Sequence, residues 1–376
     1  MAVSPRRIGI LGGSFNPIHL GHLAMAQGAL QSLLLERVLI IPANEPPHKQ
    51  LEEGASTLQR VEMARRAVMG EQGLSVSTIE IMRSGKSFTI DTLNEISGLY
   101  PNAQLFLLVG SDMLKDLPAW KNAKAVMQKA VIACICRSSA GGGELEAANM
   151  LKAEYGADVR ITDIIAPDIS SSAVRAAIAK ALPVKGLVPP LVENYIYKNA
   201  LYVTEYFKSI QESCRRGLSS GRYLHTIGVM KTALELAALY GADGNKAKLA
   251  ALLHDCGRSL DKGAISHAEK SELLAREKYQ VADEEVLKAI RLHTTLDEGA
   301  SLLDKIIYLA DMIEPNRKFQ WVEELRALAM LNLDKAVMEG LRRTIGYVKT
   351  RHLELNIKSQ RALIWLEAEL KLNPTE

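Results

Sequence analysis

The chain has 376 residues, of which 48% are hydrophobic and 24% are charged, and its formal net charge is +3. This length predicts a globular protein with two domains, and so small a charge excludes the basic surface typical of nucleic-acid binding. Four cysteines without a CxxC pair exclude a disulfide scaffold, and no apolar run approaches the roughly 18 residues of a membrane span. With no export segment before the first expected strand, these features predict a cytoplasmic protein.

The first motif is a glycine turn between a strand and a helix. Ile8 to Leu11 form an apolar run that predicts a buried strand, Gly12-Gly13 follow it, and a helix is expected to begin near His19. Free N–H groups and the positive dipole end at a helix start attract phosphate. His19 and His22 share one face of the first helical turn, and Gly21 between them leaves room for a ligand. Two surface histidines beside an ordinary turn are the alternative.

Strands and helices alternate through the rest of the first half. Further strands are expected at Val38 to Ile41, Leu74 to Ile81, Leu105 to Val109 and Val131 to Cys136, and helices at Leu58 to Met69, from Ser87, at Leu145 to Tyr155 and at Leu191 to Asn199. This alternation predicts an α/β domain with a doubly wound parallel sheet, Rossmann-like, over residues 1–203. Its ligands are expected at the carboxyl ends of the strands.

A second phosphate-binding motif is expected near the end of this domain. Ser170, Ser171 and Ser172 precede Arg175 at a helix start, so hydroxyls, free N–H groups and a guanidinium converge on one anion site. A helix cap followed by an exposed arginine is the alternative. Together with the histidine pair, the motif predicts a two-sided clamp for a triphosphate, with Mg²⁺ carried in by ATP. The sequence has no GxxxxGK[ST] loop, which excludes P-loop chemistry.

These motifs resemble the HxGH nucleotidylyltransferase superfamily. The words PANEPPHK from Pro42, TIDTL from Thr89, GSDML from Gly110 and ISSSAVR from Ile169 are similar to those of its nicotinate-nucleotide adenylyltransferase branch. The resemblance implies AMP transfer from ATP to nicotinate mononucleotide, giving deamido-NAD and pyrophosphate; another acceptor, such as nicotinamide mononucleotide, is the alternative. It implies catalytic roles for His19, His22 and Arg175. The implied ATP-binding residues are Gly12, Gly13, Ser14, Phe15, His19, His22, Ser170, Ser171, Ser172 and Arg175.

The same resemblance implies an acceptor site. Its residues would be Asn44, His48, Thr89, Asp112, Trp120 and Arg137. The Trp120 ring would stack on the nicotinate ring, with a core tryptophan as the alternative. Arg137 would pair with the nicotinate carboxylate as a fork, whereas Asp112 would hold substrate or ribose, or else cap a helix.

From about Thr204 the pattern changes to successive helices without strand candidates, which predicts an all-α domain over residues 204–376. This half contains a set of imidazoles and carboxylates: His225, His254, Asp255, His267, His293 and Asp311. These are ligands that suit divalent transition metals. The words LLHD and YLAD place an acid directly after an apolar run, and a buried carboxylate without a partner costs several kcal/mol. A metal ion is therefore expected, although each histidine alone could be an ordinary core histidine.

The set resembles the HD superfamily of phosphohydrolases. The words RYLHT, LLHD, LHTT and LADMIEPNR are similar to those of bacterial symmetrical bis(5′-nucleosyl)-tetraphosphatases of the YqeK type. The resemblance implies metal-assisted hydrolysis of diadenosine tetraphosphate to two ADP. His225, His254, Asp255 and Asp311 would hold one ion, and His267 and His293 would complete a second site that shares Asp255, the catalytic aspartate. Arg222, Arg258 and Arg317 would bind polyphosphate, with Arg258 standing where the family usually has lysine.

Iron is the expected metal, with manganese, cobalt or zinc as alternatives, in one or two sites. A non-catalytic domain for nucleotide sensing or assembly, with a structural metal, is the alternative function for this half. The expected partners are the small-molecule substrates ATP, nicotinate mononucleotide and a dinucleoside polyphosphate, with no nucleic acid and no membrane. The sequence leaves open whether the protein forms a homo-oligomer.

Overall fold

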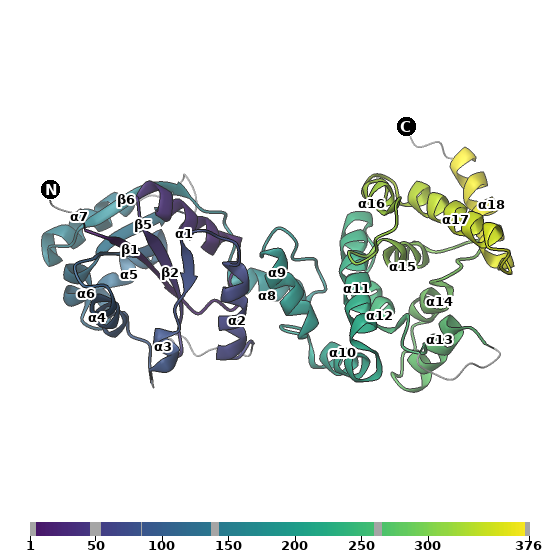
Figure 1. The fold of residues 1–376 in the computed structure, drawn as a ribbon, viewed down its shortest axis with the longest axis horizontal. Helices are drawn as coiled ribbons and strands as arrows, with labels where there is room; N and C mark the ends of the chain where they lie inside the picture. Colours follow the sequence, from purple (N-terminus) through teal and green to yellow (C-terminus); the bar gives the residue numbers. More distant parts are fainter. Residues whose placement is uncertain (1–4, 46–53, 84, 137–142, 259–264, 373–376) are drawn as a thin grey trace. The chain divides into compact units, whose positions relative to one another are not determined.

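The computed structural model describes residues 5–45, 54–83, 85–136, 143–258 and 265–372. The chain divides into two compact units (Figure 1). The N-terminal unit comprises Met1–Ala176 and Val184–Ile196, and the C-terminal unit comprises Ala177–Pro183 and Tyr197–Glu376. A domain boundary between residues 203 and 204 stays a prediction. Among the described residues, no helix combines the length and apolar character needed to cross a bilayer.

The N-terminal unit contains a six-stranded sheet in which every neighbouring pair of strands is parallel. The strands are β1 (Arg7–Gly13), β2 (Arg37–Pro42), β3 (Leu74–Val76), β4 (Gln104–Gly110), β5 (Val131–Cys136) and β6 (Val159–Ile165). Their order is β3-β2-β1-β4-β5-β6. The strand order therefore reverses direction beside β1, and the crevice at the carboxyl ends of β1 and β4 is where such sheets bind ligands.

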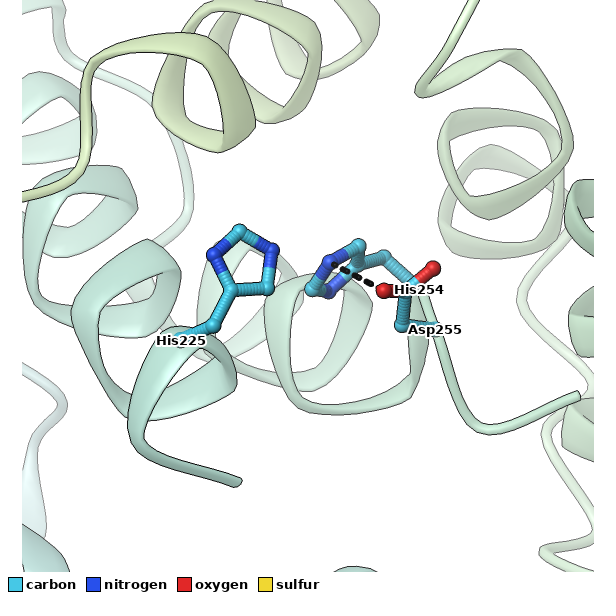
Figure 2. A group of neighbouring side chains, drawn as sticks. All are labelled: His225, His254 and Asp255. Carbon is cyan, nitrogen blue, oxygen red and sulfur yellow. Dashed lines mark ion pairs between the residues drawn. The ribbon is translucent and has the colours of Figure 1, made fainter. Parts of the chain in front are cut away.

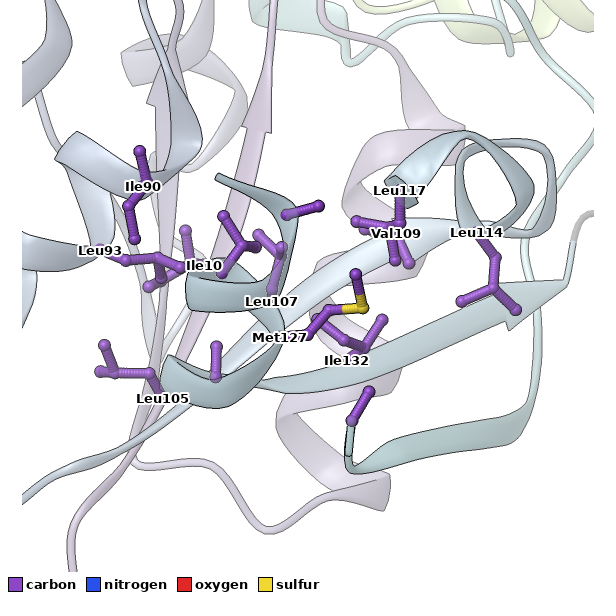
Figure 3. Close-up of a cluster of buried hydrophobic side chains, with 14 of the residues drawn as sticks. Ile10, Ile90, Leu93, Leu105, Leu107, Val109, Leu114, Leu117, Met127 and Ile132 are labelled. Carbon is purple, nitrogen blue, oxygen red and sulfur yellow. The ribbon is translucent and has the colours of Figure 1, made fainter. Parts of the chain in front are cut away.

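The central strands are apolar because both faces of the sheet are covered. Ile8 and Ile10 of β1 and Leu107 of β4 are all buried. On one face they join a cluster with side chains from the flanking helices, including Leu93 and Met127 (Figure 3). On the other face, α1 packs against β1, β2 and β6. The predicted doubly wound α/β architecture is confirmed.

The helices that lie wholly or largely in the N-terminal unit fall between the strands and after the last one. They are α1 (Leu20–Ser32), α2 (Thr57–Ala67), α3 (Ile79–Met82), α4 (Thr89–Leu99), α5 (Ser111–Asp116), the 3₁₀ turn η1 (Leu117–Ala119), α6 (Ala123–Lys129), α7 (Glu144–Tyr155), α8 (Ser171–Ala179) and α9 (Pro190–Lys198). The predicted helices all exist, with starts that shift by one to two residues, and α1 ends three residues before the Leu35 expected from its apolar spacing.

Two elements differ from the expectation. The strand predicted over Leu74 to Ile81 ends at Val76, because the chain turns into the short helix α3, which buries Glu80 where its carboxylate accepts a hydrogen bond from Thr92 Oγ1 (2.6 Å). Strand β6 was not predicted. It lies at the sheet edge, and its side chains alternate between half-buried and exposed, so the sequence carries no apolar run there.

The C-terminal unit is built from helices throughout its described residues, as predicted. They are α10 (Glu205–Gly217), α11 (Ser220–Tyr240), α12 (Gly244–Leu253), α13 (His267–Glu277), α14 (Glu284–Leu292), α15 (Leu302–Ile313), α16 (Val322–Leu331), α17 (Leu333–Thr350) and α18 (Ile357–Leu372). Helix α11 packs against α12 and α15, and α14 packs against α12, α13 and α15. The residues that directly follow α12 and α14, among them His254, Asp255 and His293, are buried within this unit.

Candidate functional site

The β1–α1 loop holds the two histidines of the first motif against each other. His19 is buried and caps the start of α1, and its backbone N–H donates to Nδ1 of His22 (3.2 Å). The two rings stack with centroids 3.6 Å apart, and the Phe15 ring meets His22 edge-on at 5.0 Å. Because Nδ1 of His22 accepts a hydrogen bond, the proton of the neutral ring sits on Nε2, which can donate to a phosphate oxygen.

Two glycines of this motif are required by close packing within the protein. A Cβ at Gly13 would stand 3.2 Å from the Phe15 ring, and one at Gly21 would stand 3.0 Å from both His19 Nδ1 and the Pro167 carbonyl oxygen. The space over Gly21, expected to receive a ligand, is thus bordered by the protein's own atoms. Gly12 has nothing within 4 Å of its Cβ position.

The second phosphate motif is bonded directly to the first. Ser170 caps α8 by accepting from the N–H of Ala173 (3.1 Å). Ser171 Oγ donates to the carbonyl of Pro17 (2.8 Å), and Arg175 donates to the carbonyl of Asn16 (2.9 Å). Residues more than 150 positions apart in sequence therefore meet at one loop. Arg175 also lies 3.4 Å from Ser172 Oγ, so the serines and the guanidinium form one polar group beside the β1–α1 loop.

A buried arginine that sequence reasoning missed joins this loop to the predicted acceptor loop. Arg60 of α2 is fully buried and donates to the carbonyls of Ser14 and Ala43, both at 2.7 Å, and to that of Asn44 (3.3 Å). The loops after β1 and β2 are thus fastened to one rigid guanidinium. The signal was a charged residue on the otherwise apolar face of α2, next to Val61.

The described acceptor-site residues lie on neighbouring segments. The Asn44 backbone N–H donates to Ser87 Oγ (2.9 Å), two residues before Thr89 at the start of α4. Trp120 follows η1, is half-buried and packs against the core cluster. Its neighbour Lys121 places its ammonium 3.9 Å from the Phe88 ring centroid, which brings the Trp120 segment to the start of α4.

The remaining predicted acceptor residues are Asp112, His48 and Arg137. Asp112 is exposed in the first turn of α5, at the carboxyl end of β4. His48 and Arg137 lie outside the described residues.

In the C-terminal unit, the predicted metal ligands converge from separate helices. Figure 2 shows His225 of α11 pointing toward His254 and Asp255, which directly follow α12. The ligand atoms of these three residues lie within 4.8 Å of one another, as do those of Asp255, His267 and His293. Asp255 belongs to both groups. Asp311 of α15 adds a carboxylate to the first group, with Oδ1 2.9 Å from His225 Nε2.

The donor atoms of this centre fit a metal ion. His254 and His293 are both fully enclosed, and each donates its Nδ1 proton to the backbone carbonyl three residues earlier at 2.7 Å. Nε2 of each ring therefore presents a lone pair, and neither Nε2 has a hydrogen bond within the described structure. These atoms face Asp255 at 3.8 and 3.6 Å. Buried imidazole nitrogens directed at a shared carboxylate are what a divalent cation requires.

The electrostatics keep His254, Asp255 and Asp311 in metal-binding form, whereas His225 would have to release a proton to bind an ion. Burial lowers the pKa of His254 to about 4, so its ring is neutral at pH 7. Burial would raise the pKa of Asp255 and Asp311, but the hydrogen bond between His225 and Asp311, the imidazoles that face Asp255, and the nearby Arg258 and Arg317 hold both well below the usual range. Burial also lowers the pKa of His225, but its hydrogen bonds to Asp311 and Glu314 outweigh burial and raise it to about 9.

Two of the three predicted polyphosphate-binding arginines lie at the centre. Arg258 is 3.3 Å from both Asp255 carboxylate oxygens and 3.4 Å from His267 Nε2, and Arg317 is 2.7 Å from Asp311 Oδ1. Arg222 is exposed on the first turn of α11, one helical turn before His225. Arg258 and Arg317 therefore place positive charge beside the two carboxylates of the centre.

Two parts of the chain match known families. Residues 10–177 match the family described as Cytidylyltransferase-like, and residues 222–316 match the HD domain. A "Probable nicotinate-nucleotide adenylyltransferase" of Gloeobacter violaceus is 40% identical over 197 residues, which are 52% of this chain and 96% of that protein.

Two solved structures resemble single parts of the chain. A "predicted HD superfamily hydrolase involved in NAD metabolism" from Clostridium acetobutylicum is 34% identical, with a TM-score of 0.41, and the match covers 43% of this chain and 97% of that one. The nicotinic acid mononucleotide adenylyltransferase of Plasmodium falciparum, complexed with NaAD, is 21% identical with a TM-score of 0.44, and the match covers 52% and 97%.

Proposed function

The chain belongs to the nicotinate-nucleotide adenylyltransferase family through its N-terminal part, and from this premise we propose that its N-terminal unit transfers AMP from ATP to nicotinate mononucleotide. The products are deamido-NAD and pyrophosphate. The observation that carries the proposal is the bonding of the Arg175 segment to the β1–α1 loop, which puts one guanidinium and two histidines around a single helix start.

The chemistry of this unit needs no covalent nucleophile. The acceptor phosphate attacks the α-phosphorus of ATP in line, and pyrophosphate leaves. His22 donates from Nε2 to a phosphate oxygen, and Arg175 with the serines of α8 neutralises the charge of the departing group. Arg60 keeps the two loops at a fixed separation, so the acceptor phosphate is held at the attacking distance.

The test is a comparison of acceptors with the full-length protein. Purified chain is incubated with ATP, Mg²⁺ and either nicotinate mononucleotide or nicotinamide mononucleotide, and dinucleotide and pyrophosphate are quantified. We expect kcat/KM to be higher for nicotinate mononucleotide. A preference for nicotinamide mononucleotide would contradict the acceptor assignment, and absence of pyrophosphate release with either acceptor would contradict adenylyl transfer.

We further propose that the C-terminal unit hydrolyses dinucleoside polyphosphates, and diadenosine tetraphosphate symmetrically to two ADP. The observation that carries this is Asp255, whose Oδ1 lies 3.5 and 3.6 Å from two imidazole nitrogens of one ligand group while its other oxygen faces His254 of the second. Such sharing suits a pair of divalent ions. Iron is the first candidate, with manganese, cobalt and zinc as alternatives.

The residues around the centre have distinct tasks. His254 and His293 direct Nε2 toward the centre, and Asp311 adds negative charge at its other end. Bound divalent ions would polarise a phosphoryl oxygen and activate water. Arg258 and Arg317 pair with the remaining negative charge of the polyphosphate chain. Because these arginines contact Asp255 and Asp311, binding of the polyphosphate exchanges one set of charged partners for another.

A metal-containing module for nucleotide sensing is the second candidate for this unit. The full-length chain is loaded in turn with Fe²⁺, Mn²⁺, Co²⁺ and Zn²⁺ and given diadenosine tetraphosphate, and the products are separated by chromatography. ADP as the sole product is expected. ATP plus AMP would contradict symmetrical cleavage, and bound metal without turnover would favour the sensing module.

A further inference from the structure

Glu314, which directly follows α15, contacts the metal-ligand candidate His225 from the side opposite the centre. Its carboxylate Oε1 lies 3.1 Å from His225 Nδ1, while His225 Nε2 faces Asp311 at 2.9 Å. Glu314 is 2% exposed, so this carboxylate interacts with the ring without competition from water. A carboxylate at Nδ1 fixes one proton there, so Nε2, which faces Asp311, is the nitrogen that an ion at the centre would bind after its proton is released.

The partner of His225 differs from those of the other two buried imidazoles. His254 and His293 donate Nδ1–H to backbone carbonyls, those of Ala251 and Ile290. A carboxylate is a stronger acceptor than a carbonyl and adds negative charge behind the ring, which raises the basicity of Nε2. Of these three ligands, His225 is therefore the one whose metal affinity is strengthened by a second acid.

The backbone around Glu314 holds the carboxylate in place. The Asn316 backbone N–H donates to Glu314 Oε2 at 2.7 Å, and Asn316 Nδ2 donates to the same oxygen at 2.9 Å. Arg326 donates to the carbonyls of Ile313 (2.8 Å), Glu314 (2.6 Å) and Arg317 (3.1 Å). The turn after α15 is thus fixed at several points, and the glutamate orientation does not depend on His225 alone.

Helix α11 leaves space for this carboxylate. Gly228 lies three residues after His225 on the same helix face, and a Cβ built there would overlap Glu314 Oε2 and approach Asn316 Nδ2 to 3.3 Å. Glycine is less favourable than alanine in a helix interior. The histidine and the glycine on one helix and the glutamate after another therefore form a matched set.

We propose that Glu314 is a positioning residue for His225 and selectively strengthens divalent-metal binding at the group formed by His225, His254, Asp255 and Asp311. This inference rests on the proposed metal centre. The group formed by Asp255, His267 and His293 has no contact with Glu314 among the described interactions, so we expect the effect of this residue to fall on the group that contains His225.

The test measures metal affinity rather than turnover. Metal-free full-length protein is titrated with Co²⁺, and binding is followed by the visible absorption of the coordinated ion and by bound cobalt after desalting. Glu314→Ala is expected to weaken one of the two cobalt-binding steps by about 10- to 100-fold and to leave the other step unchanged. Glu314→Gln keeps an acceptor without the charge and is expected to fall between Glu314→Ala and the unmodified protein.

Gly228→Ala tests the same inference from the opposite helix. It improves intrinsic helix propensity, yet its Cβ displaces the Glu314 carboxylate, so it should weaken the same cobalt-binding step as Glu314→Ala. Asp304→Asn is the matched control, because Asp304 is also a fully buried acid of α15, but its carboxylate accepts from the backbone N–H of the N-cap residue Ser301 (2.8 Å) and pairs with Lys288 (3.1 Å). It should lower thermal stability without changing cobalt affinity.

The outcomes distinguish failure of the proposed metal centre from failure of the positioning role of Glu314. If unmodified protein binds no cobalt, the metal centre itself is wrong. If it binds cobalt and Glu314→Gln and Gly228→Ala bind it equally well, the positioning role is wrong. Equal weakening of both binding steps, or an equal effect of Asp304→Asn, would show a general structural role and would also overturn the inference.

Discussion

Lys248 lies within α12, six residues before His254, and replacing it by methionine is expected to stabilise the C-terminal unit. Its side chain is 2% exposed, and its ammonium lies 4.2 Å from the Phe207 ring centroid. Burial lowers the pKa of this ammonium from 10.5 to about 8. That pKa change corresponds to a cost of roughly 3 kcal/mol for burying the charged ammonium. The desolvated cation–π contact with Phe207 offsets about 1 to 2 kcal/mol of this cost.

Methionine has a similar volume and carries no charge, so Lys248→Met should raise the free energy of unfolding by about 1 to 2 kcal/mol at pH 7. The stabilising effect of the methionine depends on pH. Between about pH 8 and 10.5 the unfolded lysine binds more protons than the folded one, so the unmodified protein gains stability as pH rises. The advantage of methionine should therefore be full below pH 8 and shrink toward pH 10.5.

Calorimetry of the full-length protein at pH 7 and pH 9.5 measures both effects as shifts in the transition of the C-terminal unit. Lys246→Met is the control, because Lys246 is on the same helix but partly exposed, where it pairs with Glu285 and Asp283. It should give a small loss of stability. A Lys248→Met protein less stable than the original at pH 7, or a gain that does not shrink at pH 9.5, would refute the reasoning.

Two further predictions concern the N-terminal unit. Trp120→Ala should raise KM for nicotinate mononucleotide about tenfold or more, because stacking on an aromatic ring contributes about 1–3 kcal/mol; steady-state kinetics with an unchanged KM would make Trp120 a core residue only. Arg60→Lys keeps the charge but loses the fork that reaches Ser14 and Ala43, so kcat should fall by about 10- to 100-fold with smaller changes in either KM. A loss of thermal stability with unchanged kcat would assign Arg60 to the fold alone.

The sequence predicts those strands and turns of the N-terminal unit in which consecutive residues share one chemical character. The strands β1, β4 and β5 are continuous apolar runs because both faces are covered, and the glycine turn after β1 is marked by its composition. Strand β6 escapes prediction because an edge strand needs no apolar face. Helix α3 escapes because one buried hydrogen bond, from Thr92 to Glu80, overrides the alternating pattern before it.

The sequence does not predict site residues whose role depends on a contact with a distant part of the chain. Residue types and spacing identify His254 and Asp255, because an acid after an apolar helix needs a partner. They do not reveal Arg60 or Glu314, whose importance comes from what they contact: two loop carbonyls in one case and the far side of His225 in the other. A charged residue on the apolar face of α2 marks Arg60 as unusual without showing what it contacts, and the contact of Glu314 leaves no periodic signal in the sequence.

The central claim is that one chain carries two separate active sites, and it is tested most directly by crossing two variants with two assays. Adenylyl transfer to nicotinate mononucleotide and hydrolysis of diadenosine tetraphosphate are measured on the full-length protein and on its His22→Ala and Asp255→Ala variants. We predict that His22→Ala lowers adenylyl transfer by at least about 100-fold and leaves hydrolysis unchanged, while Asp255→Ala does the reverse. Loss of both activities in either variant, or of neither, would contradict the account.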